Sequence, residues 1–215
     1  MSPPRPATVG RCVPAPWTGP GSHPAPDGGV GEAVVASVYV HAPFCARRCT
    51  YCDFAVQVRR SGSWREWVEA LERELSLLRE EGTFRLADRL DTVYVGGGTP
   101  SLLGPGAMAA LGRALGRERV RGAGVEWTAE ANPESFTPEV AKAWRRSGVN
   151  RVSLGVQTFH SPSLRWMGRL HGPGGALRAV GAARKAGFQQ VGVDLILGLP
   201  ERLGRSWRAD LDRIV

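Results

Sequence analysis

Three closely spaced cysteines have the clearest chemical potential in this sequence. Cys45, Cys49 and Cys52 follow the pattern C-x3-C-x2-C directly after a short β-branched run. The N-terminus lacks the layout of an export signal, and clustered thiols in a reducing compartment indicate metal ligation rather than disulfides. Thiolates are soft ligands for iron, and three of them on a four-iron cluster leave one iron open. The spacing therefore favours a [4Fe–4S] cluster whose open iron binds a further ligand.

A zinc site is the alternative for the same cysteines. Zinc also takes three cysteines and one histidine in closed sites, and His41 lies four residues before Cys45. Zinc sites usually build from paired C-x2-C units, and this stretch has only one, Cys49-Thr50-Tyr51-Cys52. We favour the cluster and expect the remaining cysteine, Cys12, to be a bystander.

The cysteines must be positioned by an alternation of strands and helices. β-branched runs predict strands over residues 37–40, 92–95, 124–128, 151–156 and 191–197. Apolar residues at helical spacing from Trp64 to Leu78 predict a helix that packs on a core. Further helices are predicted over 105–116, 138–147 and 173–186, and another from about Ser206.

This alternation predicts the α/β class with a parallel sheet and right-handed crossovers. Chemically capable residues follow every predicted strand, which describes the mouth of a barrel better than a single crevice in an open sheet. We predict a partial TIM-like (β/α) barrel over residues 37–215. A barrel of this kind needs at least one more unit, so we expect it to be incomplete at the C-terminus.

Composition sets the remaining limits. Residues 1–36 hold eight of the sixteen prolines and no hydrophobic period, which predicts a disordered extension. The net charge of +8 comes from scattered arginines rather than basic blocks, so we expect no nucleic-acid partner. No stretch approaches the roughly 18 apolar residues of a transmembrane segment, and we predict a cytoplasmic protein.

The sequence motifs around the cysteines resemble those of a known superfamily. The stretch from Tyr39 to Cys45, the cysteine spacing, and Tyr51-Cys52-Asp53-Phe54 are similar to the radical S-adenosylmethionine (radical SAM) signature. The similarity is strongest to the branch that contains the oxygen-independent coproporphyrinogen III oxidases and the HemW heme chaperones, and it runs from about residue 37 to 215. It implies the barrel of the radical SAM type and SAM as the ligand of the open iron.

The resemblance also implies which residues contact SAM. The glycine turn that begins at Gly96 contributes Gly97, Gly98 and Thr99, and Glu130 follows the third predicted strand. Without the resemblance, the glycines could simply form a tight turn, and Glu130 could be a solvated surface residue. Tyr39 and Tyr51 could have only a packing role. The implied SAM-contacting residues are Tyr39, Tyr51, Gly97, Gly98, Thr99, Glu130, Gln157, Arg169 and Asp194.

Asp194 carries a physical argument of its own. It lies between the apolar runs Val191-Gly192-Val193 and Leu195-Ile196-Leu197, in a strand expected to be buried on both faces. A carboxylate there is costly unless it is paired or points into a cavity. His160 and His171 could meet heme iron, but we expect both loop histidines to face solvent.

The residue two positions after Cys52 separates the branches of this family. The resembling oxidases carry a fourth cysteine there, whereas this chain has Phe54. Phe54 therefore argues against coproporphyrinogen oxidase activity and for a heme chaperone, which binds heme and transfers it to an acceptor protein. The resemblance implies heme as a further ligand and an electron donor such as flavodoxin or ferredoxin; an oxidase and a non-catalytic remnant stay as alternatives.

Overall fold

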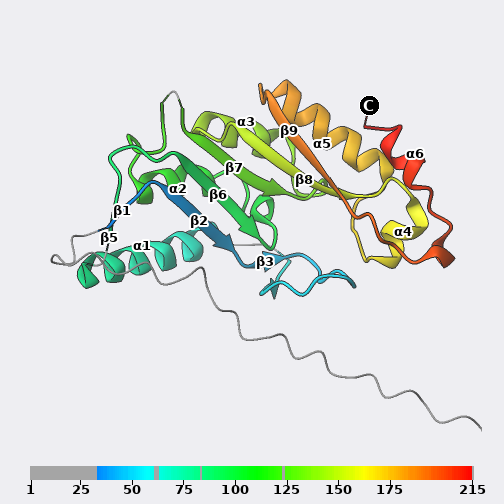
Figure 1. Cartoon of the computed structure of the whole chain (residues 1–215), viewed down its shortest axis with the longest axis horizontal. Coiled ribbons are helices and arrows are strands. Elements are labelled where there is room, and N and C mark those ends of the chain that lie inside the picture. Colours follow the sequence, from blue (N-terminus) through cyan, green and yellow to red (C-terminus); the bar gives the residue numbers. More distant parts are fainter. Residues whose placement is uncertain (1–32, 61–62, 83, 123, 215) are drawn as a thin grey trace, which may run out of the picture. The chain divides into compact units, whose positions relative to one another are not determined.

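The structure is a computed structural model that describes residues 33–60, 63–82, 84–122 and 124–214. Five parallel strands form one sheet in the order β2-β6-β7-β8-β9, so that each lies beside its neighbour in the sequence (Figure 1). Their bounds are Ser37–Ala42, Thr92–Gly97, Glu126–Ala131, Arg151–Gln157 and Gln190–Leu195. All five predicted strands are present, and the α/β class is confirmed.

Four long helices cover one side of this sheet, each packed on the next. They are α1 Trp64–Glu81, α2 Ala107–Leu115, α3 Pro138–Ser147 and α5 Pro173–Lys185. The predicted range of α3 agrees with the structure because its ends are encoded locally. Thr137 accepts a hydrogen bond from the backbone of Val140, Pro138 occupies the first turn, and Gly148 ends the helix in a left-handed conformation.

Shorter elements complete the described chain. Ala33–Val35, which the sequence assigned to the disordered extension, form the strand β1 and pair with β5. The rest of that extension, residues 1–32, lies outside the described residues, so its disorder stays a prediction. The other short elements are β3 Phe44–Cys45, β4 Gln57–Val58, β5 Phe84–Leu86, η1 Pro100–Leu103, α4 Ser161–Trp166, η2 Glu201–Leu203 and α6 Trp207–Leu211.

Alternation along the strands sends apolar and polar side chains to opposite faces. Val93, Val95, Trp127 and Ala129 are fully buried against the helices. The residues between them, including Tyr94, point to the other face, because successive side chains of a strand alternate. The helix-covered face therefore forms the core, and the opposite face is free to carry the chemistry.

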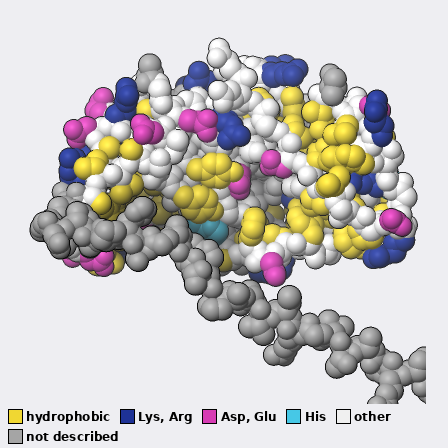
Figure 2. Space-filling view, viewed as in Figure 1, with side chains coloured by type: hydrophobic (Ala, Val, Ile, Leu, Met, Phe, Trp, Pro, Cys, Tyr) yellow, Lys and Arg dark blue, Asp and Glu magenta, His cyan; other side chains and the backbone are white. Residues whose placement is uncertain are grey.

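The strand β9 differs from the expectation that it is buried on both faces. It is the last strand of the described sheet, and its residues are half-buried or exposed, Asp194 included. Hydrophobic side chains gather over this part of the molecule in Figure 2, and Leu197, just beyond β9, is 68% exposed. Edge position is the reason, because no described strand lies beyond β9.

A buried ion pair fastens the segment after β9 to the end of β8. Asp210, 3% exposed, accepts hydrogen bonds from the Thr158 hydroxyl at 2.6 Å and from the Phe159 backbone at 2.8 Å. The guanidinium of Arg205 reaches the same carboxylate at 2.7 Å and also donates to the carbonyl of Leu197. Burial opposes ionisation, but these donors and the Arg205 charge lower the pKa of Asp210 below its usual value.

We expect Asp210→Asn to lower the free energy of unfolding by about 3 kcal/mol at pH 7, because Arg205 then stays buried without its counter-charge. A lowered pKa in the folded state means that the stabilisation is complete above the ordinary aspartate pKa and is lost as the pH falls through the folded value. Urea unfolding between pH 3 and pH 7 measures both effects. Equal stability of the variant and the wild type at pH 7 would contradict the prediction.

Candidate cluster and cofactor site

The carboxyl ends of the strands surround a cavity of about 170 Å³. This is smaller than the roughly 300 Å³ at which small-molecule pockets usually begin, so the described residues would enclose only part of a ligand of that size. Every predicted site residue except Tyr39 lines it. Those lining residues are Cys45, Cys49, Tyr51, Cys52, Gly97, Gly98, Thr99, Glu130, Gln157, Arg169 and Asp194.

The start of the cysteine loop is fastened to the glycine turn after β6. The backbone N–H groups of Gly98 and Thr99 donate to the carbonyls of Ala42 and Phe44, both at 2.8 Å. Gly97 has a φ of +106°, and a Cβ on it would lie 2.4 Å from the His41 ring. Only glycine allows this backbone conformation together with this close packing.

The three thiols lie around the same cavity as free cysteines. Burial raises the pKa of the Cys45 thiol, and the nearby Cys52 and Cys49 add to the shift; its sulfur is also 3.4 Å from the Thr99 hydroxyl. Among the described residues, no three His, Cys, Asp or Glu side chains converge on one point as a single zinc ion requires. The thiolates of a four-iron cluster bind different irons and need no such convergence.

Gly98 packs closely against the backbone and sulfur of the first cysteine segment. A Cβ at this position would lie 2.8 Å from the Phe44 carbonyl oxygen and 3.1 Å from the Cys45 sulfur. Such a side chain would displace the backbone that carries the first cysteine. The residues present fit a thiolate-bound cluster, because the three cysteines and the glycine backbone line the same cavity.

Arg169 connects the cysteine loop to the ends of β7 and β8. Its guanidinium donates to the Asn132 side chain at 2.7 Å, to the carbonyl of Gly155, and to the Cys49 sulfur at 3.7 Å. Burial opposes its charge, but Tyr51, Glu134 and Cys49 together raise the pKa of Arg169. Its Nε stays buried without a hydrogen-bond partner among the described residues. Arg169 thus places a positive charge 3.7 Å from the Cys49 sulfur.

Tyr51 also lines the cavity, close to Cys49 and Arg169. Burial raises the pKa of Tyr51 to about 12, with Arg169 acting in the opposite direction and Cys49 adding to the increase. Its phenol therefore stays protonated at neutral pH.

Asn132 is a site residue that the sequence interpretation did not select. Its amide nitrogen donates to the Thr99 hydroxyl at 3.1 Å, and its oxygen accepts from Arg169. It thereby joins the glycine turn after β6 to the arginine after β8. The sequence feature that could have identified Asn132 is its place in Glu130-Ala131-Asn132-Pro133, two residues after the predicted site residue Glu130.

Gln157 ends β8 with a strained backbone. Its φ of +68° is the left-handed conformation, which residues other than glycine adopt rarely. The sheet register shifts between Gly155 and Gln157, and the Gln157 carbonyl accepts from the backbone of Ile196. No sequence signal marks this conformation.

Asp194 points into the cavity and is paired. The Ser153 hydroxyl lies 2.9 and 3.0 Å from its two carboxylate oxygens. The carboxylate is thus both paired and directed into a cavity, the two arrangements expected from the sequence. The residues of β9 around it are half-buried or exposed rather than buried.

Tyr39 lies beside the site rather than in its lining. It is 60% exposed and stacks on Tyr94 with ring centroids 6.0 Å apart. Its hydroxyl is 3.2 Å from His41 Nδ1, and His41 Nε2 is 2.9 Å from the Ala55 carbonyl oxygen. Both ring nitrogens of His41 are therefore engaged with groups other than the cysteines.

The two loop histidines differ from the expectation that they face solvent. His171 is 6% exposed, with Nε2 3.2 Å from the Val156 carbonyl oxygen and Nδ1 3.3 Å from Glu134. His160 is half-buried, and its Nδ1 is 2.9 Å from the Ser163 hydroxyl. Pairing at helix and strand ends, which spacing alone does not reveal, explains the difference.

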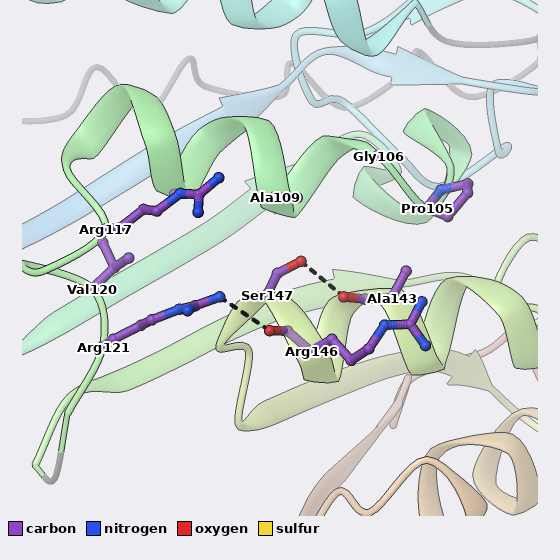
Figure 3. Close-up of a pocket in the computed structure, with 10 residues that line it drawn as sticks. Pro105, Gly106, Ala109, Arg117, Val120, Arg121, Ala143, Arg146 and Ser147 are labelled. Atoms are coloured by element: carbon purple, nitrogen blue, oxygen red, sulfur yellow. Dashed lines mark hydrogen bonds between the residues drawn. The ribbon is translucent and has the colours of Figure 1, made fainter.

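A larger cavity of about 430 Å³ lies between α2 and α3 (Figure 3). Arg117, Arg121 and Arg146 line it, and no cysteine, histidine or carboxylate does. It contains none of the predicted site residues and offers no ligand for iron. The smaller cavity at the strand ends is therefore the candidate site.

Residues 39–214 match the family model described as "Radical SAM superfamily". The chain belongs to the radical SAM superfamily. Membership implies a [4Fe–4S] cluster and SAM as cofactors. The helices of the described part include none long and apolar enough to cross a membrane.

Several curated relatives of this radical SAM chain are named heme chaperone HemW. The one from Lactococcus lactis is 36% identical over 179 residues, which are 83% of this chain and 45% of that protein. The one from Mycobacterium tuberculosis is 42% identical over 166 residues, 76% of this chain and 42% of that protein. A mouse relative, "Radical S-adenosyl methionine domain-containing protein 1, mitochondrial", is 36% identical over 91% of this chain and 43% of its own length. The chain thus spans less than half the length of these relatives.

Solved structures of the superfamily share the fold. The coproporphyrinogen III oxidase HemN of Escherichia coli matches with a TM-score of 0.71 and 29% identity, over 86% of this chain and 42% of that one. The methyltransferase TsrM of Kitasatospora setae, solved with cobalamin and a [4Fe–4S] cluster bound, matches with a TM-score of 0.55 and 19% identity, over 84% and 32% of the two chains. The partial barrel of the radical SAM type is confirmed.

We expect Gly97→Ala to lower the free energy of unfolding by about 3 kcal/mol, from roughly 1 kcal/mol of left-handed strain and roughly 2 kcal/mol of overpacking against His41. Gly82 is the matched control, since its φ is +64° and nothing lies within 4 Å of an added Cβ. Gly82→Ala should therefore lose only about 1 kcal/mol. Urea unfolding of both variants measures the difference, and equal losses would contradict the packing argument.

Proposed function

We propose that Cys45, Cys49 and Cys52 hold the cluster, and that SAM binds at the open iron against the glycine turn. Gly97 and Gly98 line the cavity with backbone that is packed against His41 and the cysteine loop, while Thr99 is held by Asn132. Arg169 neutralises thiolate charge from its buried position. With both groups bound, these residues would hold a centre that supplies one-electron reductive cleavage of SAM.

The remaining predicted contacts provide polar groups around the same cavity. Glu130 and Asp194 offer carboxylate oxygens to hydroxyl or ammonium donors, and Gln157 offers an amide. Tyr51 contributes a protonated phenol, and Tyr39 borders the site from outside the cavity. These assignments are carried over from the family resemblance, and those of Glu130, Gln157 and Asp194 are supported by their positions at the carboxyl ends of β7, β8 and β9.

We further propose that the protein is a heme chaperone, which binds heme and transfers it to an acceptor protein. Phe54 is the observation that carries this proposal, because it is among the residues that line the cavity and stands where the resembling oxidases carry a fourth cysteine. The relatives named HemW support it. An electron donor such as flavodoxin or ferredoxin serves the cluster; the cytoplasm stays our prediction for the compartment, although the mouse relative is named mitochondrial.

A coproporphyrinogen III oxidase is the second candidate. The structural match to the Escherichia coli enzyme favours it, because a TM-score of 0.71 reflects a closely related arrangement of strands around the site. The three cysteines that an open-iron cluster needs are present in either case. The two functions therefore differ in what happens to a porphyrin, not in the cluster.

Replacing any one of Cys45, Cys49 and Cys52 by Ser should abolish reconstitution of the cluster, because each supplies one of only three protein ligands. Cys12→Ser is the matched control and should retain the wild-type iron content. Iron and acid-labile sulfide analysis after anaerobic reconstitution measures this. A Cys12→Ser variant that loses iron, or a cysteine-loop variant that keeps it, would contradict the ligand assignment.

Heme titration of the reconstituted protein, with an assay for porphyrinogen decarboxylation in the same sample, separates the two functions. A carrier binds heme stoichiometrically and leaves the porphyrinogen unchanged. Decarboxylation with consumption of SAM would show that Phe54 does not exclude oxidase chemistry. Phe54→Cys is a useful companion, since gain of decarboxylation in that variant alone would assign the difference to this position.

A further inference from the structure

Tyr94 and Glu130 meet above Gly96, where β6 and β7 lie side by side. The register pairs Tyr94 with Thr128 and Val95 with Ala129, and the next residues along the two strands are Gly96 and Glu130. Because side chains alternate along a strand, Glu130 lies on the same face as Tyr94. A Cβ on Gly96 would lie 2.9 Å from Tyr94 Cε1 and 3.1 Å from Glu130 Cδ. The missing side chain at Gly96 is what allows these two side chains to touch.

The Glu130 carboxylate is fixed by one donor on each oxygen. The Tyr94 hydroxyl donates to Oε1 at 2.7 Å, and the backbone N–H of Gly97 donates to Oε2 at 3.2 Å. Two donors on opposite oxygens define how the carboxylate is rotated, yet each oxygen keeps a lone pair for a further donor. Glu130 lines the cofactor cavity, whereas Tyr94 does not.

Tyr94 is itself held in place. Its ring stacks on Tyr39 at an interplanar angle of 19°, and Tyr39 is tied to His41 by a hydrogen bond. Burial and the hydrogen bond to Glu130 raise the pKa of Tyr94, which keeps its phenol protonated and able to donate. Packing alone would be served equally well by phenylalanine, so the hydroxyl is the part that needs an explanation.

We propose that Tyr94 is a positioning residue that orients the Glu130 carboxylate toward the ligand in the cofactor cavity. The identity of that ligand as SAM rests on the proposed function. Tyr94 acts through Glu130 and does not contact the ligand. Hydroxyl or ammonium donors of the ligand then meet a carboxylate whose direction is already set, and less conformational freedom is lost on binding.

A double-mutant cycle on the reconstituted holoprotein tests this proposal. The variants are Tyr94→Phe, Glu130→Ala and the combination, with SAM affinity measured by equilibrium dialysis and cluster content by iron analysis. Thr128→Val is the matched control, because it removes a hydroxyl from the neighbouring position of β7 that bonds to Glu126 rather than to Glu130. A crystal structure of Tyr94→Phe gives the carboxylate position independently of SAM.

We expect Tyr94→Phe to weaken SAM binding about tenfold, as for the loss of one hydrogen bond to a charged group, with unchanged iron content. The same change should have no effect in the Glu130→Ala background, and Thr128→Val should bind like the wild type. Wild-type affinity in Tyr94→Phe or in Glu130→Ala, or the same tenfold loss from Tyr94→Phe in both backgrounds, would overturn the proposal.

Failure of the proposed function is distinguishable from failure of the positioning role. A wild-type holoprotein that binds no SAM contradicts the proposed function, and the crystal structure then decides on Tyr94. Movement of the Glu130 carboxylate away from the Gly97 N–H in Tyr94→Phe supports the positioning role. A carboxylate that keeps this contact without the Tyr94 hydroxyl overturns it.

Discussion

A side chain at any of positions 96, 97 and 98 would occupy space that the site already uses. Above Gly96, the Tyr94 phenol meets the Glu130 carboxylate; the His41 ring lies against Gly97; and Gly98 lies against the strand that carries the first cysteine. Close packing of this kind leaves no volume for even one methyl group. The glycine turn thus fixes the position of the cysteine loop relative to the neighbouring strand ends.

The hydrogen bonds of Arg169 extend this arrangement across the sheet. They join Asn132 after β7, Gly155 in β8 and Cys49 in the loop, three segments far apart in the sequence. A planar guanidinium with several donors suits such a role, whereas the point charge of a lysine would not reach all three acceptors. The sequence has two lysines against 26 arginines, and this composition gives no hint of the contribution of Arg169.

The sequence predicts well whatever its local chemistry determines. Helix α3 agrees with its predicted range because Thr137, Pro138 and Gly148 mark its ends, and the glycine turn was found from its composition. The strand β7 begins at Glu126, two residues later than predicted, because β-branched content does not fix where pairing starts. The exposure of β9 and the left-handed Gln157 depend on sheet topology, which no local pattern encodes.

The choice between heme carrier and oxidase is separable from the cluster. In the site that we propose, Cys45, Cys49 and Cys52 are the three protein ligands that leave one iron open, so Phe54 removes none of them. What it changes is the wall of the cavity: a side chain 61% exposed presents an aromatic face where the resembling oxidases have a thiol. An aromatic face favours contact with a flat apolar molecule, whereas a thiol can exchange a proton or a hydrogen atom with a substrate. In the function that we propose, position 54 therefore bears on what a porphyrin would undergo at the site, and the cluster loop can be the same in both branches.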